Sequence, residues 1–246
     1  MAGPWNGPTS GLIHRWPLDI VNLSGGADHD VVGSINITEN GSVTSGFGPT
    51  TQADTCRIFN GQIGSYGAVA SSPLPTTGAF TLSCWGYTTD NNTQTGGIIP
   101  TPINLASNGS TQNCVRISTE GTGTTNNLPG DVYFVVYPGA VNLVTSTAVP
   151  FGGSSWAQFG ITFDGASTYQ LIVNGIAVAQ KAGTSGRTTS FNDAIASRDA
   201  TGGAWNGGLA QLAIYNSVLS AADLVQLYNA DMAQIAQVQG IAWSEW

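Results

Sequence analysis

Hydrophobic and polar residues alternate most clearly along residues 156–182. In 156–163 a period of two predicts a β-strand with two different faces. One face would carry Ala157, Phe159, Ile161 and Phe163, and the other Trp156, Gln158, Gly160 and Thr162. Asn174-Gly175 then separates the runs 169–173 and 176–180. This dipeptide accepts positive φ at both central positions of a type I′ turn, so the two runs are predicted to form a hairpin.

Similar patterns predict short strands along most of the chain. The expected ranges are 12–18, 31–38, 56–59, 66–69, 79–88, 98–105, 113–118, 132–137, 141–147 and 209–215, with a further short strand near 188–191. In 79–88 the alternation places Phe80, Leu82 and Cys84 on the core face. In 209–215 it places Ala210, Leu212 and Ile214 there. The polar, glycine-rich stretch 41–54 is expected to be an extended loop.

One helix is predicted after the last strand. Ser220-Ala-Ala-Asp223 resembles a capping box with an acid in the first turn. Apolar residues then recur at helical spacing. They are Leu224, Leu227, Tyr228, Met232, Ile235 and Val238, with Asp231 beside Met232. The pattern as a whole predicts an all-β chain with one C-terminal α-helix.

Four segments together resemble the laminin-G-like jelly roll of the concanavalin A-like lectin/glucanase superfamily. They are GLIHRWPLD at 11–19, GAFTLSCWG at 78–86, the pattern from Trp156 to Gly175, and the closing strand and exit at 207–220. The resemblance implies a two-sheet antiparallel jelly-roll sandwich. It divides the chain into an arm at 1–10, the jelly roll at 11–229, and a helical extension with a tryptophan-bearing tail at 230–246. Sugar-binding modules, enzymes and structural domains all use this fold, so it selects no function.

The composition argues against several classes of partner. Only 8% of the 246 residues are charged, against about 25% in typical domains, and the net charge is −8. This balance argues against nucleic acid and offers no basic patch for anionic lipid. No segment approaches the roughly 20 apolar residues that cross a bilayer. A polar but weakly charged surface suits carbohydrate, and it also suits a subunit packed into a large assembly.

The three cysteines, Cys56, Cys84 and Cys114, are an odd number without metal-ligand spacing. We therefore expect no disulfide framework, and we interpret Cys84 as a small buried apolar residue.

The two ends of the sequence bear on location and assembly. Residues 1–8 have neither a positive start nor an apolar run, so no secretory signal is recognised. Either a leader was removed before residue 1, or the protein is made in a cytoplasm and reaches its site by assembly; the starting Met favours the second. Trp243 and Trp246 in the tail would be costly to leave in water. They either fold back onto their own sheet or dock on another subunit.

The residues needed for glycan cleavage are missing from the sequence. Glucanases of the superfamily place two or more acids on one strand, as Glu-x-Asp-x-Glu or a close relative, but Glu39, Glu120 and Glu245 each lack an acidic neighbour at that spacing. Lyases of this fold use an Arg strand with Gln, His and Tyr partners. Neither His14 nor His29 belongs to such a cluster. We therefore do not expect an enzyme.

The resemblance also implies a possible structural calcium ion. Asp30-Val-Val-Gly33-Ser-Ile-Asn36 matches a family loop that reads Asp-x-x-Gly-x-x-Asn. Side-chain oxygens of Asp30 and Asn36, with nearby backbone carbonyls, would suit this cation. The family's closing strand supplies an acid where this chain has Ala210 or Gln211. A hydrogen-bonded loop without metal is therefore the alternative.

Candidate sugar-binding residues lie on the non-core faces of the predicted strands. Aromatic rings can pack against the apolar faces of sugars, with amides and hydroxyls at the edges. The predicted ligand-binding set is Trp85, Tyr87, Tyr133, Trp156, Gln158 and Tyr215, with Tyr137 and Gln211 nearby in the pattern. Either these residues form an open aromatic surface or loops cover them and they are simply packed. Alternation does not separate the two.

The favoured hypothesis is a non-enzymatic recognition or structural module on the surface of a viral (phage) particle. It would be a decoration, fibre or spike subunit that binds glycans and assembles with itself or with other virion subunits. A secreted, extracellular lectin-like module is the alternative. A polysaccharide-degrading enzyme is disfavoured by the missing carboxylates.

Overall fold

The computed structural model describes residues 5–19, 22–47, 56–88, 101–105, 115–119, 132–136, 141–144, 156–183, 193–197 and 203–237. For 115–119, 132–136, 141–144 and 234–237 the backbone alone is described.

The strand predicted at 156–163 and the hairpin predicted after it are three neighbouring strands at one end of a sheet. β13 (Ala157–Phe163) pairs antiparallel with β14 (Thr168–Val173), which pairs with β15 (Ile176–Ala182). Asn174 and Gly175 both have positive φ, at 48° and 76°, as the two-residue hairpin requires. The hairpin prediction is confirmed.

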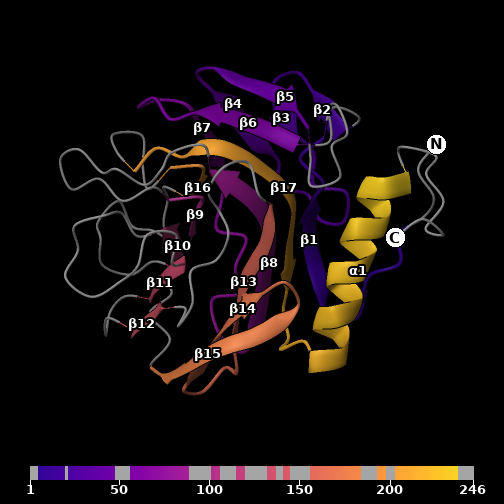
Figure 1. Cartoon of the computed structure of the whole chain (residues 1–246), viewed down its shortest axis with the longest axis vertical. Helices are drawn as coiled ribbons and strands as arrows, with labels where there is room; N and C mark the ends of the chain where they lie inside the picture. The colour runs from indigo at the N-terminus through magenta and orange to yellow at the C-terminus, as the bar shows by residue number, and fades with distance from the viewer. Residues whose placement is uncertain are drawn as a thin grey trace.

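These strands belong to an antiparallel sheet, sheet A, whose strand order is β15-β14-β13-β8-β17-β6-β5, with β1 pairing to β17 (Figure 1). Its other members are β1 (Leu12–Trp16), β5 (Val43–Gly46), β6 (Cys56–Asn60), β8 (Phe80–Thr88) and β17 (Asn206–Tyr215). The second sheet, sheet B, has the order β12-β11-β10-β9-β16-β7-β4-β3-β2. It contains β2 (Leu23–Ser24), β3 (Ala27–Asp28), β4 (Ile37–Asn40), β7 (Tyr66–Val69), β9 (Ile103–Leu105), β10 (Val115–Thr119), β11 (Val132–Val136), β12 (Val141–Val144) and β16 (Ala194–Ile195). The fold is therefore the expected two-sheet antiparallel sandwich with one C-terminal helix.

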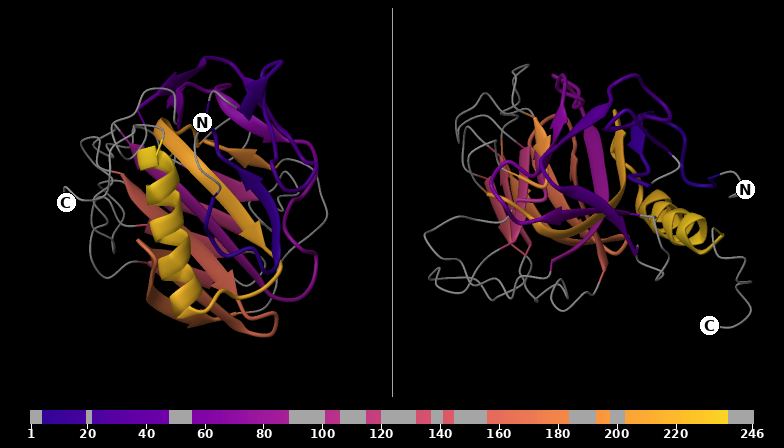
Figure 2. Two further views of the ribbon diagram at one scale, coloured as in Figure 1. Left: turned by 90° about the vertical axis from the view of Figure 1, so that its right-hand side faces the viewer. Right: turned by 90° about the horizontal axis from the view of Figure 1, so that it is seen from above.

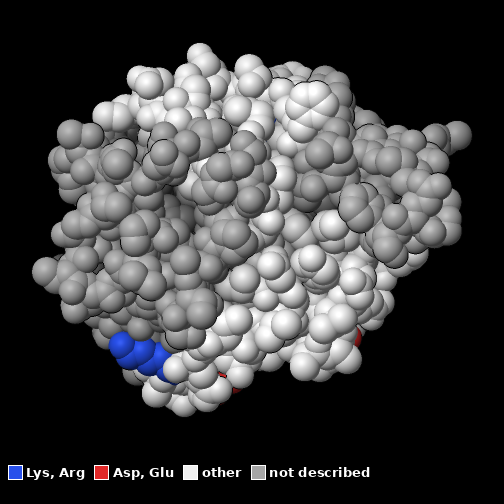
Figure 3. Space-filling model, viewed as in Figure 1, with Lys and Arg blue, Asp and Glu red and all other residues white. Residues whose placement is uncertain are grey.

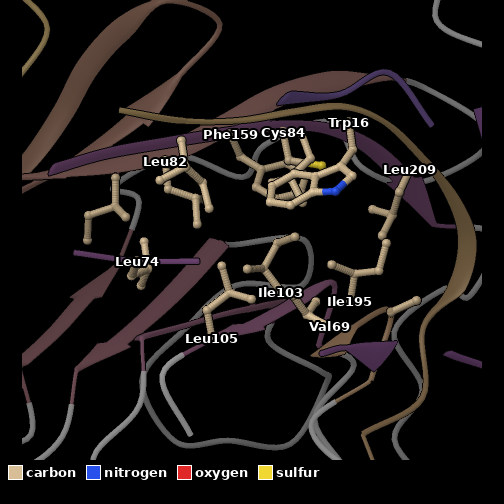
Figure 4. Packing of buried hydrophobic residues seen from close by; sticks show 14 of the residues in the cluster. Trp16, Val69, Leu74, Leu82, Cys84, Ile103, Leu105, Phe159, Ile195 and Leu209 are labelled. Atoms are coloured by element: carbon tan, nitrogen blue, oxygen red, sulfur yellow. The ribbon is translucent and has the colours of Figure 1, made fainter. Parts of the chain in front are cut away.

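The hydrophobic core lies between the two sheets. The predicted core faces of the neighbouring strands β13 and β8 both point into this core. Ile103, Leu105 and Ile195 of sheet B lie opposite them (Figure 4). Cys84 is fully buried in this core, where burial raises the pKa of its thiol and keeps it uncharged. Cys56 is also buried and neither thiol is part of a disulfide, and the interpretation of Cys84 as a small buried apolar residue is confirmed. Cys114 lies outside the described residues.

The closing strand β17 departs from simple alternation. Leu209, Leu212 and Ile214 belong to the core, but Ala210 lies on the outer face with Trp85 and Cys56. The pairing of β17 with β8 shifts between Ala210 and Ala213, and Gln211 has a φ of 50°. This β-bulge adds one residue and reverses the sides of the strand. The prediction that Ala210 faces the core was therefore wrong.

Two other predictions of strands and loops were wrong. Residues 31–36 form a loop, and pairing begins only at β4. Val43–Gly46, expected in an extended loop, pairs with β6 as β5. The predicted strand near 188–191 lies outside the described residues.

Helix α1 (Ala221–Gln237) lies across the outer face of sheet A (Figure 2). It begins at the predicted capping box, where the N–H of Asp223 donates to Ser220 Oγ at 3.2 Å and the N–H of Ser220 donates to Asp223 Oδ2 at 3.2 Å. Leu224 and Leu227 pack against Ile172, Ala213 and Tyr215 of the sheet. The helix continues through the predicted boundary at 229–230. No described helix is long and apolar enough to cross a bilayer.

Candidate functional site

Two of the predicted ligand-binding residues form an aromatic pair on the outer face of sheet A. Tyr87 comes from β8 and Trp156 directly precedes β13. The register that pairs Ala157 with Gly86 brings them together. Their ring centroids lie 4.7 Å apart in an edge-to-face arrangement at 67°. Both residues are partly buried and keep some exposure to solvent.

The aromatic pair rests on a glycine of the closing strand. Gly208 pairs with both Tyr87 and Ile58. A Cβ at Gly208 would lie 2.7 Å from Trp156 Cη2 and would also collide with the Tyr87 ring. The absence of a side chain at this position therefore lets the rings lie directly on the sheet. We call this surface of Ile58, Tyr87, Trp156 and Gly208 the aromatic shelf.

The aromatic shelf is uncharged. Burial raises the pKa of Tyr87, so its hydroxyl is neutral at physiological pH and can donate and accept hydrogen bonds. The other three members are apolar or lack a side chain. The shelf can therefore offer ring faces and edges, with one hydroxyl at its border, but no charge and no nucleophile.

Helix α1 covers three other members of the predicted ligand-binding set. Trp85, Gln158 and Tyr215 are 2%, 1% and 0% exposed. The Trp85 ring stacks on Tyr228 of the helix with centroids 5.2 Å apart. A ligand could reach these residues only if α1 moved away. Their role in binding stays a prediction.

Asp231 on α1 connects the helix to this covered surface. Its Oδ2 accepts hydrogen bonds from Trp85 Nε1 at 3.2 Å and Gln158 Nε2 at 3.4 Å, and its Oδ1 accepts one from Trp5 Nε1 at 3.2 Å. Burial raises the pKa of Asp231 to about 6, against the opposing effects of Arg15 and of these hydrogen bonds. An acid in the apolar stripe of the predicted helix was the available signal, but the sequence did not say what it would bind.

Arg15 and its neighbours complete the covered polar cluster. The Arg15 guanidinium lies 4.6 Å from the centroid of the Trp5 ring, and its Nη2 donates to Gln211 Oε1 at 2.5 Å. Gln211 is the residue with positive φ in the bulge of β17, so the bulge turns an amide toward the arginine. The N-terminal arm, β1, β17 and α1 all meet at this cluster.

The remaining predicted aromatic residue lies in the other sheet. Tyr133 is on β11 of sheet B, where it pairs with Ser118 and Val144. It therefore does not share a sheet with Tyr87 and Trp156. Tyr137 and the tail residues Trp243 and Trp246 lie outside the described residues.

The predicted calcium ligands form a loop that is closed by hydrogen bonds. Asp30 accepts hydrogen bonds from the His14 ring and from the backbone N–H groups of Arg15, Val32, Gly33 and Ile35. Asn36 Oδ1 accepts the N–H of Asp30 at 3.2 Å. Burial alone would raise the pKa of Asp30, but its donors more than offset this and lower it. Both candidate ligands already accept N–H groups, so they do not fit a cation.

Among the described residues, no three His, Cys, Asp or Glu side chains gather where they could hold a metal ion. The two acids that do come together, Asp28 and Glu39, share Arg57. Arg57 Nε lies 3.0 Å from Asp28 Oδ1 and 2.8 Å from Glu39 Oε1. Because these residues come from β3, β4 and β6, the cluster joins sheet B to sheet A inside the sandwich. Burial, opposed by Arg57 and reinforced by Glu39, raises the pKa of Asp28 to about 7.

Comparison with known families agrees with this architecture. Residues 60–225 match the laminin-G-like family model described as the concanavalin A-like lectin/glucanases superfamily. The chain belongs to this superfamily. No curated protein matches the sequence.

Several solved structures share the fold. The binding domain of Paraclostridial Mosquitocidal Protein 1 has a TM-score of 0.67 at 16% identity, over 89% of this chain and 52% of that one. Domain 4 of AbnA, an extracellular arabinanase from Geobacillus stearothermophilus solved with arabinotriose, has a TM-score of 0.63 at 17% identity, over 89% and 98%. The receptor-binding domain of botulinum neurotoxin C/D has a TM-score of 0.65 at 13% identity, over 89% and 51%. The chain thus spans about half the length of the two toxin chains and nearly all of the arabinanase domain. At these identities the likeness shows the fold.

Proposed function

We propose that this chain is a non-enzymatic recognition module that binds a neutral glycan on the aromatic shelf. The observation that carries the proposal is the partly exposed pair of Tyr87 and Trp156 lying over Gly208. Aromatic rings provide a large apolar contact area for the C–H face of a sugar, and a neighbouring hydroxyl can bind its edge. The shelf has no charge to select an acidic or basic ligand. Figure 3 shows a face of the molecule on which the described side chains are almost all uncharged.

Two further observations support binding over cleavage. Glycosidases need two carboxyl groups about 5–10 Å apart on either side of an open bond-breaking position. Asp28 and Glu39 are instead both engaged by Arg57 inside the sandwich. Among the relatives by fold, the arabinanase domain was solved with a neutral arabinose oligosaccharide, and the two toxin domains are described as binding domains.

The biological setting that we propose is the surface of a viral (phage) particle, with the chain as a decoration, fibre or spike subunit. The low content of charged residues and the tryptophans at 243 and 246 support a subunit that packs against others. A secreted lectin-like module is the rival setting. Both settings use the same shelf.

A glycan array on the full chain tests the binding proposal. We expect a neutral oligosaccharide to bind, and we expect Trp156→Ala and Tyr87→Ala each to weaken it about 5- to 30-fold, as for the loss of about 1–2 kcal/mol of contact. Phe47→Ala is the matched control, because Phe47 is an exposed aromatic residue at the end of β5. A failure of every glycan to bind would contradict the proposal. Binding that Trp85→Ala abolishes, and that the two shelf variants keep, would move the site beneath α1.

The assembly proposal has a separate test. Light scattering would compare the full chain with a version that lacks 238–246 and keeps α1 complete, because Asp231 is buried against the sheet. We expect an oligomer from the full chain and a monomer from the shortened one. A monomer in both cases would contradict docking through the tail, and the glycan site would stand.

A further inference from the structure

The carboxylate of Asp30 is surrounded by donors from two segments of the chain. Oδ1 accepts the backbone N–H groups of Arg15, Val32 and Gly33 at 3.0, 3.1 and 2.8 Å. Oδ2 accepts from His14 Nδ1 at 2.6 Å and from the N–H of Ile35 at 3.3 Å. The side chain of Asp30 is fully buried. Five donors thus converge on a group with about four lone-pair sites.

The same loop is fixed to β1 by further contacts. The N–H of Val31 donates to the carbonyl of Arg15 at 2.8 Å, and Trp16 Nε1 donates to the carbonyl of Ile35 at 2.6 Å. The His14 ring stacks on Trp16 with centroids 5.3 Å apart, which fixes the direction of Nδ1. A Cβ at Gly33 would lie 2.5 Å from Asp30 Oδ2, so a side chain at this position would disrupt the ring of donors.

This arrangement competes directly with a cation. Calcium needs six to eight oxygen ligands with free lone pairs. Here each oxygen of Asp30 already faces the positive ends of N–H dipoles, which supply the electrostatic stabilisation that a metal would otherwise give. The Asn36 side-chain oxygen is also occupied, by the N–H of Asp30. Calcium could bind Asp30 only after several of these hydrogen bonds broke.

We propose that His14 and the backbone amides around Asp30 replace a structural cation in this chain, so that the loop 30–36 closes on β1 without calcium. Asp30 is the centre of the loop, and His14 is the side chain that completes its ring of donors. The inference is independent of glycan binding on the aromatic shelf, because it concerns a different part of the molecule.

Thermal unfolding and titration calorimetry of the full chain test the proposal. We expect the same melting temperature in millimolar calcium chloride and in EDTA, and no heat of calcium binding. Asp30→Asn should lower the melting temperature by at least about 5 °C. The NH2 group of Asn would be a donor at the position of one carboxylate oxygen, facing N–H groups that now donate to that oxygen. His14→Ala should lower it by a smaller amount. Asp164→Asn is the matched control, because Asp164 Oδ1 also accepts three backbone N–H groups, but in an exposed turn.

A calcium-dependent rise in the melting temperature of the wild type, lost in Asp30→Asn, would overturn the proposal. A rise that survives in Asp30→Asn would place the ion elsewhere and leave the loop as proposed. If Asp30→Asn does not fold, the calorimetry of the wild type and of His14→Ala decides, since binding of calcium by His14→Ala alone would show that the imidazole excludes the ion. Equal melting temperatures for Asp30→Asn and Asp164→Asn would also contradict a special role for Asp30.

Discussion

At the residue scale, Asp231 determines how the C-terminal helix sits on the sandwich. It is a buried carboxylate that accepts hydrogen bonds from two indoles and one amide. A buried charge is tolerated only when such partners and a nearby cation offset its lost hydration. Here Arg15 supplies the positive charge. The three donors come from parts of the chain that are far apart in sequence. Hydrogen bonds to this one side chain therefore connect the N-terminal arm, β8 and β13 to α1.

Asp231→Ala should therefore be strongly destabilising. The variant leaves Trp5, Trp85 and Gln158 without this acceptor and removes a negative charge that stabilises the Arg15 guanidinium, and we expect a loss of about 3–5 kcal/mol from the free energy of unfolding in urea. Asp223→Ala is the control on the same helix. It removes only the capping contact with Ser220 and should cost about 1 kcal/mol. Equal losses in the two variants would show that Asp231 contributes no more than a surface cap.

At the element scale, α1 and the N-terminal arm stabilise each other. The Trp5 ring packs over Arg15 while its Nε1 bonds to Asp231, and Gln226 Nε2 donates to the carbonyl of Asn6 at 2.9 Å. The arm therefore holds α1 at two of its residues, Asp231 and Gln226, and the described part of the arm, residues 5–10, forms neither a strand nor a helix.

Trp5→Ala should loosen α1 without unfolding the sandwich. Loss of the hydrogen bond to a carboxylate and of the cation–π contact should cost at least about 1.4 kcal/mol, which is a tenfold change in the opening equilibrium of the helix. Hydrogen exchange measured by mass spectrometry should then be about tenfold faster in α1 and unchanged in β8 and β13. Val225→Ala, on the exposed side of the helix, should leave the exchange of α1 as it is. Uniformly faster exchange across both sheets would instead show that Trp5 supports the whole fold.

The elements also show which features the sequence could predict. The hairpin at Asn174-Gly175, the core face of β8 and the capping box each follow from local chemistry within a few residues. The bulge at Gln211 does not, because no glycine marks it and alternation looks regular across it. The position of α1 was equally hidden: its apolar stripe predicts that it packs on something, but not that it covers Trp85, Gln158 and Tyr215. Of the candidate site, strand alternation predicted only that Tyr87 and Trp156 lie on non-core faces, and their proximity depends on the pairing of β8 with β13, which alternation does not predict.

At the scale of the whole molecule, buried carboxyl groups link stability to pH. Asp28 and Asp231 have pKa values raised to about 7 and about 6 by burial, well above the value near 4 of an unfolded chain. Between pH 4 and 7 the folded protein therefore holds more protons than the unfolded one, and the free energy of unfolding falls as the pH rises. Asp30 and Asp164 have lowered pKa values, so their contributions are present above pH 4 and are lost as the pH falls below it. The two effects together place the maximum of stability near pH 4–5.

Urea unfolding at a series of pH values tests this expectation. Each extra proton held by the folded state should contribute up to about 1.4 kcal/mol per pH unit to the slope between pH 4 and 7. The net charge of −8 at pH 7 acts in the same direction, because self-repulsion weakens as the pH approaches the isoelectric point near 4.3. Asp28→Asn and Asp231→Asn separate the two causes, since each should flatten the slope by its own proton. Asp164→Asn is the control. It also removes one negative charge, but the pKa of Asp164 is lowered, so this group does not titrate between pH 4 and 7 in the folded protein and the slope should be unchanged. Stability that rises from pH 4 to 7 in the wild type would mean that Asp28 and Asp231 are ionised at lower pH than their burial implies, with Arg57 and Arg15 as the stronger influence on each.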